Sequence, residues 1–376
     1  MEGKIIYKQI IMKKHLYKLL VILVILLSGC SWQDINKSNV RNPKVRNIIL
    51  FIGDGMGTAQ VYAGMSMNGE PLVLESFPYT GFSKTYSSDN YVTDSGAGGT
   101  AIACGIKTNN GMIGVGPDSL AVASIVEIAH KNGLATGVLS TSSITHATPA
   151  SFVAHNVNRN NYEDIAKDFL NGTVDVFIGG GEDHFRKRSD GADLAMALKE
   201  KGYDVVYNIE DLKKSGSQKI AGLLAGEHMP TVMEGREGML AQMTAKAIET
   251  LSRDKDGFFL MVEGSMIDFG GHAKDFPYVV SEVIDLDMAI GVAREFADKN
   301  GETLIVVTAD HETGGLSLTG GDLKSRKVAS NFIQSGNHTG VMVPIFSYGP
   351  GAARFSGIHE NTFFLNEFID LLRISK

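Results

Sequence analysis

The sequence predicts an α/β protein, a three-layer α/β/α sandwich around a large and mostly parallel central sheet. Short apolar runs that suit buried strands alternate with amphipathic segments that suit helices, an order typical of parallel sheets covered on both faces. The expected strands, each bounded by glycine or polar residues, are 47–53, 134–139, 174–178, 203–207, 258–262 and 303–308. The expected helices are 124–132, 192–201, 239–252 and 279–299. Residues 211–237 lack a clear period, which predicts a surface excursion.

Composition indicates one large folded domain. The chain has 376 residues, of which 43% are hydrophobic and 20% are charged, enough for a sizeable core. No internal repeat and no clear linker follow residue 46, so residues 47–376 are predicted to be a single domain. The 42 acidic and 35 basic residues give a net charge of -7, which argues against a nucleic-acid-binding surface.

The N-terminal region resembles an export signal. Basic residues precede the apolar run 19–27, which is too short to span a membrane but suits a secretory signal. The run ends in Leu-Ser-Gly-Cys, which resembles a bacterial lipoprotein signal. We therefore expect residues 1–29 to be a signal peptide, Cys30 to be lipidated, and residues 30–46 to be a tether to a bacterial membrane, on its periplasmic or cell-surface side. An ordinary cleaved signal or a short anchor is the alternative. With Cys30 lipidated, Cys104 has no disulfide partner.

Metal-compatible side chains stand where several expected strands end. Asp54 follows the first strand, Glu263 follows 258–262, and Asp310 and His311 closely follow 303–308. The carboxyl ends of strands in open α/β sheets form the usual ligand-binding edge, so these side chains are expected to meet. The remaining candidates with oxygen or nitrogen ligand atoms are Asp268, His272 and His338. This set is sufficient for more than one metal ion and predicts metal-assisted chemistry.

A candidate nucleophile lies in the segment 92–101, where Ser95 leads small residues into an expected helix. Free N–H groups and the helix dipole favour an anion at such an N-terminus. The alternative is that Asp94 or Ser95 is simply a helix cap.

These segments and their order resemble the alkaline phosphatase family. The resemblance covers residues 47–349 and rests on Asp54-Gly55-Met56-Gly57, the segment 92–111, His146-Ala147-Thr148-Pro149-Ala150 followed by Arg159, Val262-Glu263-Gly264 with Asp268 and His272, Thr308-Ala309-Asp310-His311, and Asn337-His338-Thr339-Gly340. Taken singly, these residues have ordinary explanations: a surface pair, core histidines or a salt-bridge arginine. As an ordered series they are far more specific.

The resemblance implies three metal ions and a phosphoserine mechanism. Two would be zinc, one held by Asp268, His272 and His338 and the other, next to Ser95, by Asp54, Asp310 and His311. Asp54 would also bridge to a third ion, magnesium, held by Thr148 and Glu263. Ser95 would be the nucleophile, activated by its zinc, and Arg159 would clamp the phosphoryl oxygens, oriented by Asp94. The family also suggests a homodimer.

Two positions depart from the pattern of some family members. His146 stands where some carry aspartate, which shifts the third ion's preference from magnesium towards a softer ion. Phe269 stands where some carry lysine or histidine and removes a positive neighbour of the phosphate. Only 26 residues separate His311 from His338, which predicts a compact catalytic domain with a reduced crown insertion and an open site.

We therefore expect a phosphate monoester hydrolase that acts at alkaline pH on small phosphomonoesters and releases inorganic phosphate. The alternatives are a phosphodiesterase of the same superfamily or a lipid-anchored protein that binds phosphate or metal without turnover. A sulfatase of that superfamily is disfavoured, because neither Ser95 nor Cys104 has the sequence context of a sulfatase nucleophile.

Overall fold

The structure, a computed structural model, describes residues 44–376. These residues form one compact unit, Lys44–Lys376, which begins before the expected start at residue 47 because Val45 is buried in the core. The expected signal peptide, Cys30 and most of the tether lie outside the described residues. Within 44–376, no helix has the length and apolarity needed to cross a membrane.

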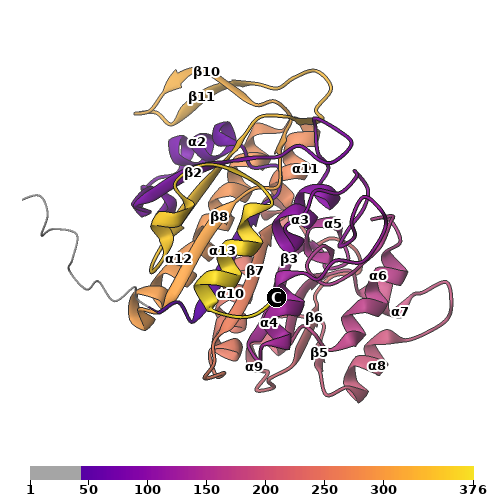
Figure 1. Cartoon of the computed structure of the whole chain (residues 1–376). Coiled ribbons are helices and arrows are strands. Elements are labelled where there is room, and N and C mark those ends of the chain that lie inside the picture. Colours follow the sequence, from indigo (N-terminus) through magenta and orange to yellow (C-terminus); the bar gives the residue numbers. More distant parts are fainter. Residues whose placement is uncertain (1–43) are drawn as a thin grey trace, which may run out of the picture. The chain divides into compact units, whose positions relative to one another are not determined.

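A ten-stranded sheet forms the centre of the unit, in the order β14-β2-β13-β8-β1-β7-β3-β4-β6-β5 (Figure 1). Its strands are β1 (Asn47–Gly53), β2 (Tyr79–Lys84), β3 (Ala135–Ser143), β4 (Val176–Gly180), β5 (Asp204–Val206), β6 (Ile220–Leu223), β7 (Phe258–Gly264), β8 (Thr303–Thr308), β13 (Val343–Tyr348) and β14 (Gly357–Glu360). Within this sheet of the described residues, only β13 pairs antiparallel, with β2 and β8, so the predicted mostly parallel sheet is confirmed.

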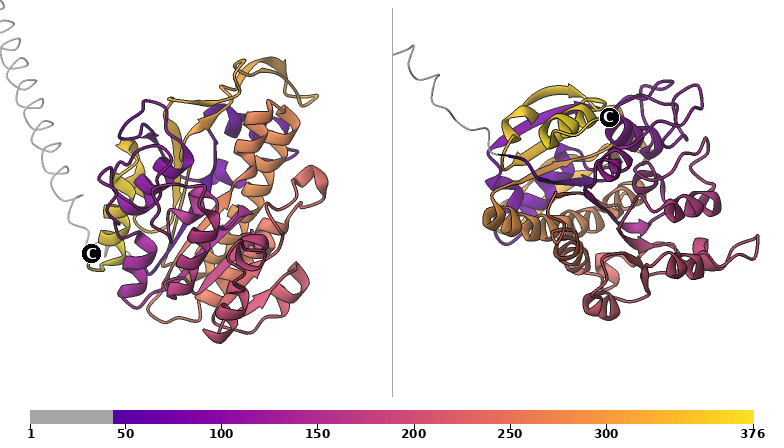
Figure 2. Two further views of the ribbon diagram at one scale, coloured as in Figure 1. Left: turned by 90° about the vertical axis from the view of Figure 1, so that its right-hand side faces the viewer. Right: turned by 60° about the horizontal axis from the view of Figure 1, so that its bottom comes forward.

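Helices cover both faces of the sheet (Figure 2). They are α2 (Thr58–Met67), α3 (Ser95–Cys104), α4 (Ile125–Lys131), α5 (Ala147–Ala150), α6 (Tyr162–Asp168), α7 (Glu182–Arg186), α8 (Leu194–Glu200), α9 (Ile209–Lys214), α10 (Met239–Leu251), α11 (Met266–Ala273), α12 (Phe276–Asn300) and α13 (Phe363–Leu372). Short 3-10 turns occur at Val73–Ser76, Phe169–Asn171, Val232–Glu234 and Ala352–Phe355.

Alternation along β1 explains the three layers. Ile48, Leu50 and Ile52 join the core cluster that includes residues of α3, α4 and α13, while Ile49 and Phe51 join the cluster that includes residues of α2, α10 and α12. Successive side chains of a strand point to opposite faces, so a strand that is apolar throughout must be covered on both. The predicted α/β/α sandwich is therefore confirmed.

The prediction for residues 211–237 was wrong. This region contributes β6 to the interior of the sheet, between β4 and β5. It also contains Arg236, whose fully buried guanidinium pairs with Glu282 and, at 2.6 Å, with Asp285 of α12. A four-residue strand and a buried ion cluster leave no periodic apolar pattern, so neither could be recognised from the local sequence.

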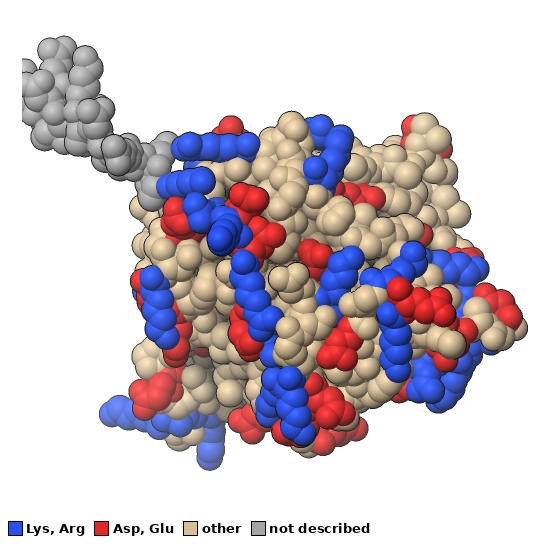
Figure 3. Space-filling view, turned by 90° about the horizontal axis from the view of Figure 1, so that it is seen from below, with Lys and Arg blue, Asp and Glu red and all other residues tan. Residues whose placement is uncertain are grey.

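Charged side chains of both signs are interspersed on the face seen from below, at the opposite end from the β10–β11 hairpin (Figure 3). This hairpin consists of β10 (Ser317–Asp322) and β11 (Lys327–Asn331). Mixed charge on that face agrees with the modest net charge of -7.

An ion pair between His155 and Glu127 of α4 makes a pH-dependent contribution to stability. His155 Nε2 lies 3.0 Å from Glu127 Oε1, and this hydrogen bond raises the pKa of His155 from 6.5 to about 8. A raised pKa favours the folded state below pH 6.5, and the contribution is lost as the pH rises through 8. We expect the stability difference between wild type and His155→Gln to shrink by about 1–2 kcal/mol from about pH 6 to about pH 9, measured by urea unfolding at fixed metal concentration. A difference that stays constant would contradict this assignment.

Candidate active site

The register of the central strands brings the predicted acids together. Ile52 of β1 pairs with Glu263 of β7 on one side and with Thr308 of β8 on the other, so the three strands end at the same level. Asp54 and Asp310 stand just beyond these ends, and both are fully buried. The acids therefore lie together at the carboxyl edge of the sheet, as predicted.

The first group consists of Asp54, Asp310 and His311, whose potential ligand atoms lie within 4.8 Å of one another. His311 Nε2 is 3.4 Å from Asp54 Oδ1 and 3.3 Å from Asp310 Oδ2. These two carboxylate oxygens are buried and have no hydrogen-bond partner. Burying an unpaired carboxylate oxygen costs folding free energy. A cation bound between these residues would remove that cost.

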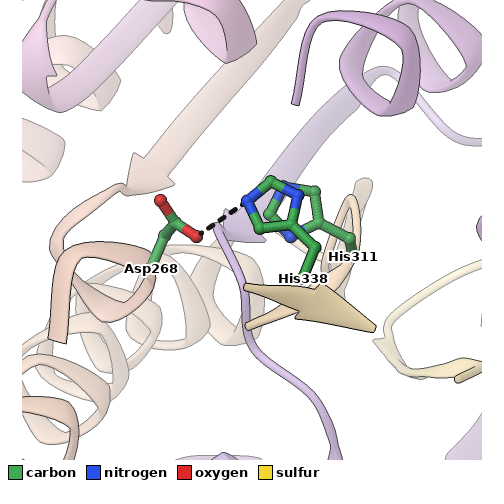
Figure 4. Close-up of side chains that lie close together, drawn as sticks. All are labelled: Asp268, His311 and His338. Atoms are coloured by element: carbon green, nitrogen blue, oxygen red, sulfur yellow. Dashed lines mark ion pairs between the residues drawn. The ribbon is translucent and has the colours of Figure 1, made fainter. Parts of the chain in front are cut away.

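The second group contains Asp268 of α11, His338 of β12 (His338–Thr339) and the ring of His311 (Figure 4). His338 Nε2 lies 3.5 Å from Asp268 Oδ1, and the His311 and His338 rings stack with centroids 3.6 Å apart. His272, the third predicted ligand, places its Nε2 3.1 Å from that of His338 and 3.4 Å from Asp268 Oδ1. Their other ring nitrogens contact backbone carbonyls, of Gly336 for His272 and of Thr93 for His338, which orients both rings.

The third group consists of Asp54, Glu263 and His146, so it shares Asp54 with the first group. Thr148 donates a hydrogen bond to Asp54 Oδ2 at 3.1 Å, so this predicted ligand is also adjacent. His146 is nearly buried, and its Nδ1 has no hydrogen-bond partner. From the sequence, His146 is expected beside the site and not among the metal ligands, whereas its geometry makes it a candidate ligand. Phe269 packs beside it, with ring centroids 6.0 Å apart.

Ser95 is the first residue of α3, and its Oγ lies 3.1 Å from His311 Nε2. Glycines allow this approach. A Cβ on Gly98 would come within 3.1 Å of Asp310, and one on Gly99 within 3.1 Å of Ser151. The small residues after Ser95 therefore let α3 pack directly against the strand ends.

Asp94 has both of the roles considered for it. Its Oδ1 accepts a hydrogen bond from Ala97 N at 2.9 Å and caps α3. Its Oδ2 accepts from Arg159 Nη1 at 2.9 Å and from Gly111 N, which holds the guanidinium beside the site. Arg159 Nη2 lies 3.5 Å from His146 Nε2, so the arginine stands between Asp94 and the third group.

The electrostatics of the cluster favour bound cations. Burial, followed by repulsion from Asp310, raises the pKa of Asp54 well above its ordinary value, and burial raises the pKa of Glu263 to about 7 and that of Asp310 to about 6. Burial lowers the pKa of His146 to about 3, leaving a neutral imidazole. Like charges confined in a low-dielectric site disfavour ionisation unless a positive charge joins them.

Asp268 differs from the other acids. Burial would raise its pKa, but hydrogen bonds from His272 and His338 outweigh this effect and hold the pKa well below its ordinary value. The same contact with Asp268 raises the pKa of His272. A positive charge is therefore favoured at this carboxylate, whether it is carried by an imidazolium or by a metal ion.

Several residues that support the site were not predicted from the sequence. Ser140 and Ser265 donate to the two oxygens of Glu263 at 2.5 and 2.9 Å, and Thr313 contacts both Asp268 and His311. Ser140 belongs to a run of hydroxyl residues that ends β3, so the strand-end signal used for Asp54 could have found it. His228, which packs against His146 and Phe269, lies in the region taken for a surface excursion and gave no signal.

The donor set fits divalent cations. Carboxylates and imidazoles converge, which is the ligand chemistry of zinc, while carboxylates with a threonine hydroxyl suit a harder ion. A serine at a helix N-terminus and an arginine complete an anion-binding arrangement beside them. Fold and site together define the class as a metal-binding hydrolase of phosphate esters.

Comparison with known proteins identifies the family. The alkaline phosphatase family model matches residues 45–332. Alkaline phosphatase 4 of Bacillus subtilis is 32% identical over 93% of this chain and 94% of its own length, and alkaline phosphatase of Escherichia coli is 32% identical over 87% and 86%. The structure of alkaline phosphatase from the Antarctic bacterium TAB5 superposes with a TM-score of 0.85 at 42% identity, covering 89% of this chain and all of the other. The chain belongs to the alkaline phosphatase family, and its activity is phosphate monoester hydrolysis.

Proposed function

We propose that this hydrolase forms a phosphoserine at Ser95 and carries two zinc ions and one magnesium ion. The observation that carries the proposal is the position of Ser95 Oγ, 3.1 Å from His311 Nε2 at the start of α3, with Asp54 and Asp310 around the same imidazole nitrogen. A non-catalytic binding protein would not require a serine hydroxyl aimed into a cluster of metal-ligating groups.

The proposed ligands keep the assignment that the family resemblance implies, which takes His272 in place of His311 in the second group and Thr148 in place of His146 in the third. Asp268, His272 and His338 hold one zinc, Asp54, Asp310 and His311 hold the other, and Asp54, Thr148 and Glu263 hold the third ion. When bound, these ions supply positive charge that favours an ionised serine oxygen and offsets the charge of the leaving oxygen.

The proposed reaction has two steps, in which Ser95, Arg159 and the N-terminus of α3 take part. Ser95 Oγ attacks the phosphorus, the bond from phosphorus to the leaving oxygen breaks, and a phosphoserine forms; the serine proton is released and the leaving oxygen takes up one proton to depart as the alcohol. Water then attacks the same phosphorus, the bond from phosphorus to Ser95 Oγ breaks, one proton of that water is taken up by Ser95 Oγ, and inorganic phosphate leaves. The Arg159 guanidinium, fixed by Asp94, neutralises the phosphoryl oxygens throughout. The N-terminus of α3 adds favourable electrostatics.

The identity of the third ion depends on His146, which lies beside Asp54 and Glu263. A histidine-to-aspartate mutant of the TAB5 enzyme is described with magnesium bound in its M3 site. This chain has His146 beside Asp54 and Glu263, and its imidazole reduces the preference for magnesium over softer ions. We nevertheless propose magnesium there, because Asp54, Glu263 and Thr148 offer oxygen ligands that suit a hard ion, and metal analysis of protein purified in both zinc and magnesium is the test. Zinc alone in three equivalents would contradict it.

The substrate is proposed to be a range of small phosphomonoesters. Between His311 and His338 the chain forms only β9 (Glu312–Thr313), the β10–β11 hairpin and their connections. This short excursion supports a single catalytic domain over residues 47–376 with a reduced crown insertion and an open site. A homodimer is proposed from the family resemblance alone, and light scattering of the purified protein tests it.

Export and lipid anchoring at Cys30 are proposed from the sequence of residues 1–46. Removal of residues 1–29 would leave Cys30 as the first residue, with the tether connecting it to the folded unit. We expect the protein expressed in a bacterial host to incorporate labelled palmitate and to sediment with membranes, and Cys30→Ala to lose both properties. Palmitate labelling that persists in the variant would exclude Cys30 as the attachment site.

The experiment that tests the proposed function compares three substrates at alkaline pH. An aryl phosphate monoester, an aryl phosphate diester and an aryl sulfate are supplied with zinc and magnesium, and again with a chelator. We expect the monoester to dominate and its turnover to disappear with the chelator. Preference for the diester or the sulfate would assign the chain to another branch of the superfamily, and no turnover on any of them would favour a binding function.

A further inference from the structure

Thr313 lies between two of the proposed metal groups. In the small sheet formed by β9 and β12, Thr313 pairs with His338. Its side chain is buried, and its Oγ1 lies 2.5 Å from Asp268 Oδ1 and 3.2 Å from His311 Nδ1. One hydroxyl therefore contacts a proposed ligand of the first zinc and a proposed ligand of the second.

The chemistry of these three groups determines the direction of both hydrogen bonds. A threonine hydroxyl has one proton, and an ionised carboxylate can only accept. The short contact with Asp268 requires Thr313 to donate to it. Thr313 Oγ1 is then left as an acceptor towards His311, so His311 Nδ1 must carry the ring proton. The Nε2 of His311 consequently keeps a free lone pair.

That lone pair points to the centre of the site. His311 Nε2 is the atom that faces Ser95 Oγ at 3.1 Å, Asp54 Oδ1 at 3.4 Å and Asp310 Oδ2 at 3.3 Å. In the opposite tautomer, Nε2 would carry a proton in the position where a metal ion must bind. The choice of tautomer therefore decides whether His311 can be a metal ligand.

The side chain of Thr313 is held in place by close packing against two glycines. A Cβ on Gly55 would lie 2.7 Å from Thr313 Oγ1, and a Cβ on Gly271 would lie 2.9 Å from Thr313 Cγ2. Thr313 N also donates to Gly55 O at 3.1 Å. Backbone on both sides thus restricts the rotamer that directs the hydroxyl to Asp268 and His311.

We propose that Thr313 is a positioning residue that sets the tautomer of His311 and orients Asp268, and so couples the two zinc groups through one hydroxyl. This inference rests on the proposed function, because it assumes that both groups bind zinc. Groups in contact with metal ligands typically change metal affinity by roughly 10–100-fold when removed.

The test compares Thr313→Ser with Thr313→Ala, which differ only in the hydroxyl. Zinc affinity of the metal-free full-length protein is measured by competition with a chromophoric chelator, and the thermal midpoint is measured without metal. We expect Thr313→Ser to bind zinc within about threefold of wild type and Thr313→Ala to bind the more strongly affected ion roughly 10-fold or more less tightly. The matched control pair is Thr250→Ser and Thr250→Ala, at a buried threonine of α10 whose hydroxyl has no partner in the described structure.

The results separate the inference from the proposed function. Equal zinc affinities of Thr313→Ser and Thr313→Ala, with a lower metal-free thermal midpoint for the alanine variant, would give Thr313 a purely structural role and overturn the inference alone. A wild-type protein that binds no zinc would overturn the proposed metal centre and the inference with it. Weakened zinc binding in Thr313→Ala, restored in Thr313→Ser and unchanged in the Thr250 pair, would support it.

Discussion

Ser95→Ala is expected to reduce turnover of an aryl phosphate monoester by at least about 10³-fold while leaving zinc content unchanged. The physical reason is that Ser95 Oγ is the atom that would form the phosphoserine, and its removal leaves the proposed metal ligands intact. Phosphate binding should persist, because Arg159 and the start of α3 remain. Steady-state kinetics, metal analysis and phosphate inhibition of a metal-replete preparation measure the three properties.

A control serine makes this test specific. Ser66 is a buried serine of α2, outside the groups described above, and Ser66→Ala should retain wild-type turnover. Acid quench of wild type with radioactive substrate should trap a labelled serine peptide containing Ser95, and Ser95→Ala should trap none. Turnover by Ser95→Ala within about tenfold of wild type would exclude the phosphoserine mechanism and indicate direct attack by water.

Asp54→Asn is expected to lose two of the three ions, because Asp54 belongs to both the group with Asp310 and His311 and the group with Glu263. An amide is neutral and offers a single acceptor oxygen, so neither ion would keep its shared anionic ligand. We expect metal analysis to find about one ion per chain and monoesterase activity to fall to the level of chelator-treated wild type.

The same substitution should have the opposite effect on metal-free protein. Burial and repulsion from Asp310 raise the pKa of Asp54 well above its ordinary value, so the metal-free fold is destabilised as the pH rises above the unfolded-state pKa of about 4. The neutral amide that replaces the carboxylate in the variant would carry no such charge.

Denaturant unfolding at about pH 8 with and without metals measures this reversal. We expect metal-free Asp54→Asn to be at least as stable as metal-free wild type, whereas metals at about 100 times their dissociation constant stabilise wild type by about 3 kcal/mol per ion and the variant by less. A metal-free variant less stable than wild type would mean that Asp54 is stabilised by contacts in the protein alone.

The sequence by itself determined the class of fold and predicted the residues at the centre of the candidate site. Both signals are local. The apolar runs 47–53, 258–262 and 303–308 identify buried strands from consecutive residues, and Asp54, Glu263 and Asp310 stand at or just beyond their ends. Parallel strands that end at the same edge bring such residues together without further information, so the expected cluster followed from secondary structure and sheet direction.

Only the tertiary structure decided which atoms face one another. The four-residue strand β6, the antiparallel strand β13 and the pairing of Thr313 with His338 depend on partners far away in the sequence, and short segments have no period of their own to indicate them. The position of His146 beside Asp54 and Glu263 and the contacts of Thr313 likewise depend on packing between elements that are far apart in the sequence. Burial by those elements removes solvent from the acids and imidazoles. This desolvation disfavours the ionised carboxylates unless a cation binds between them.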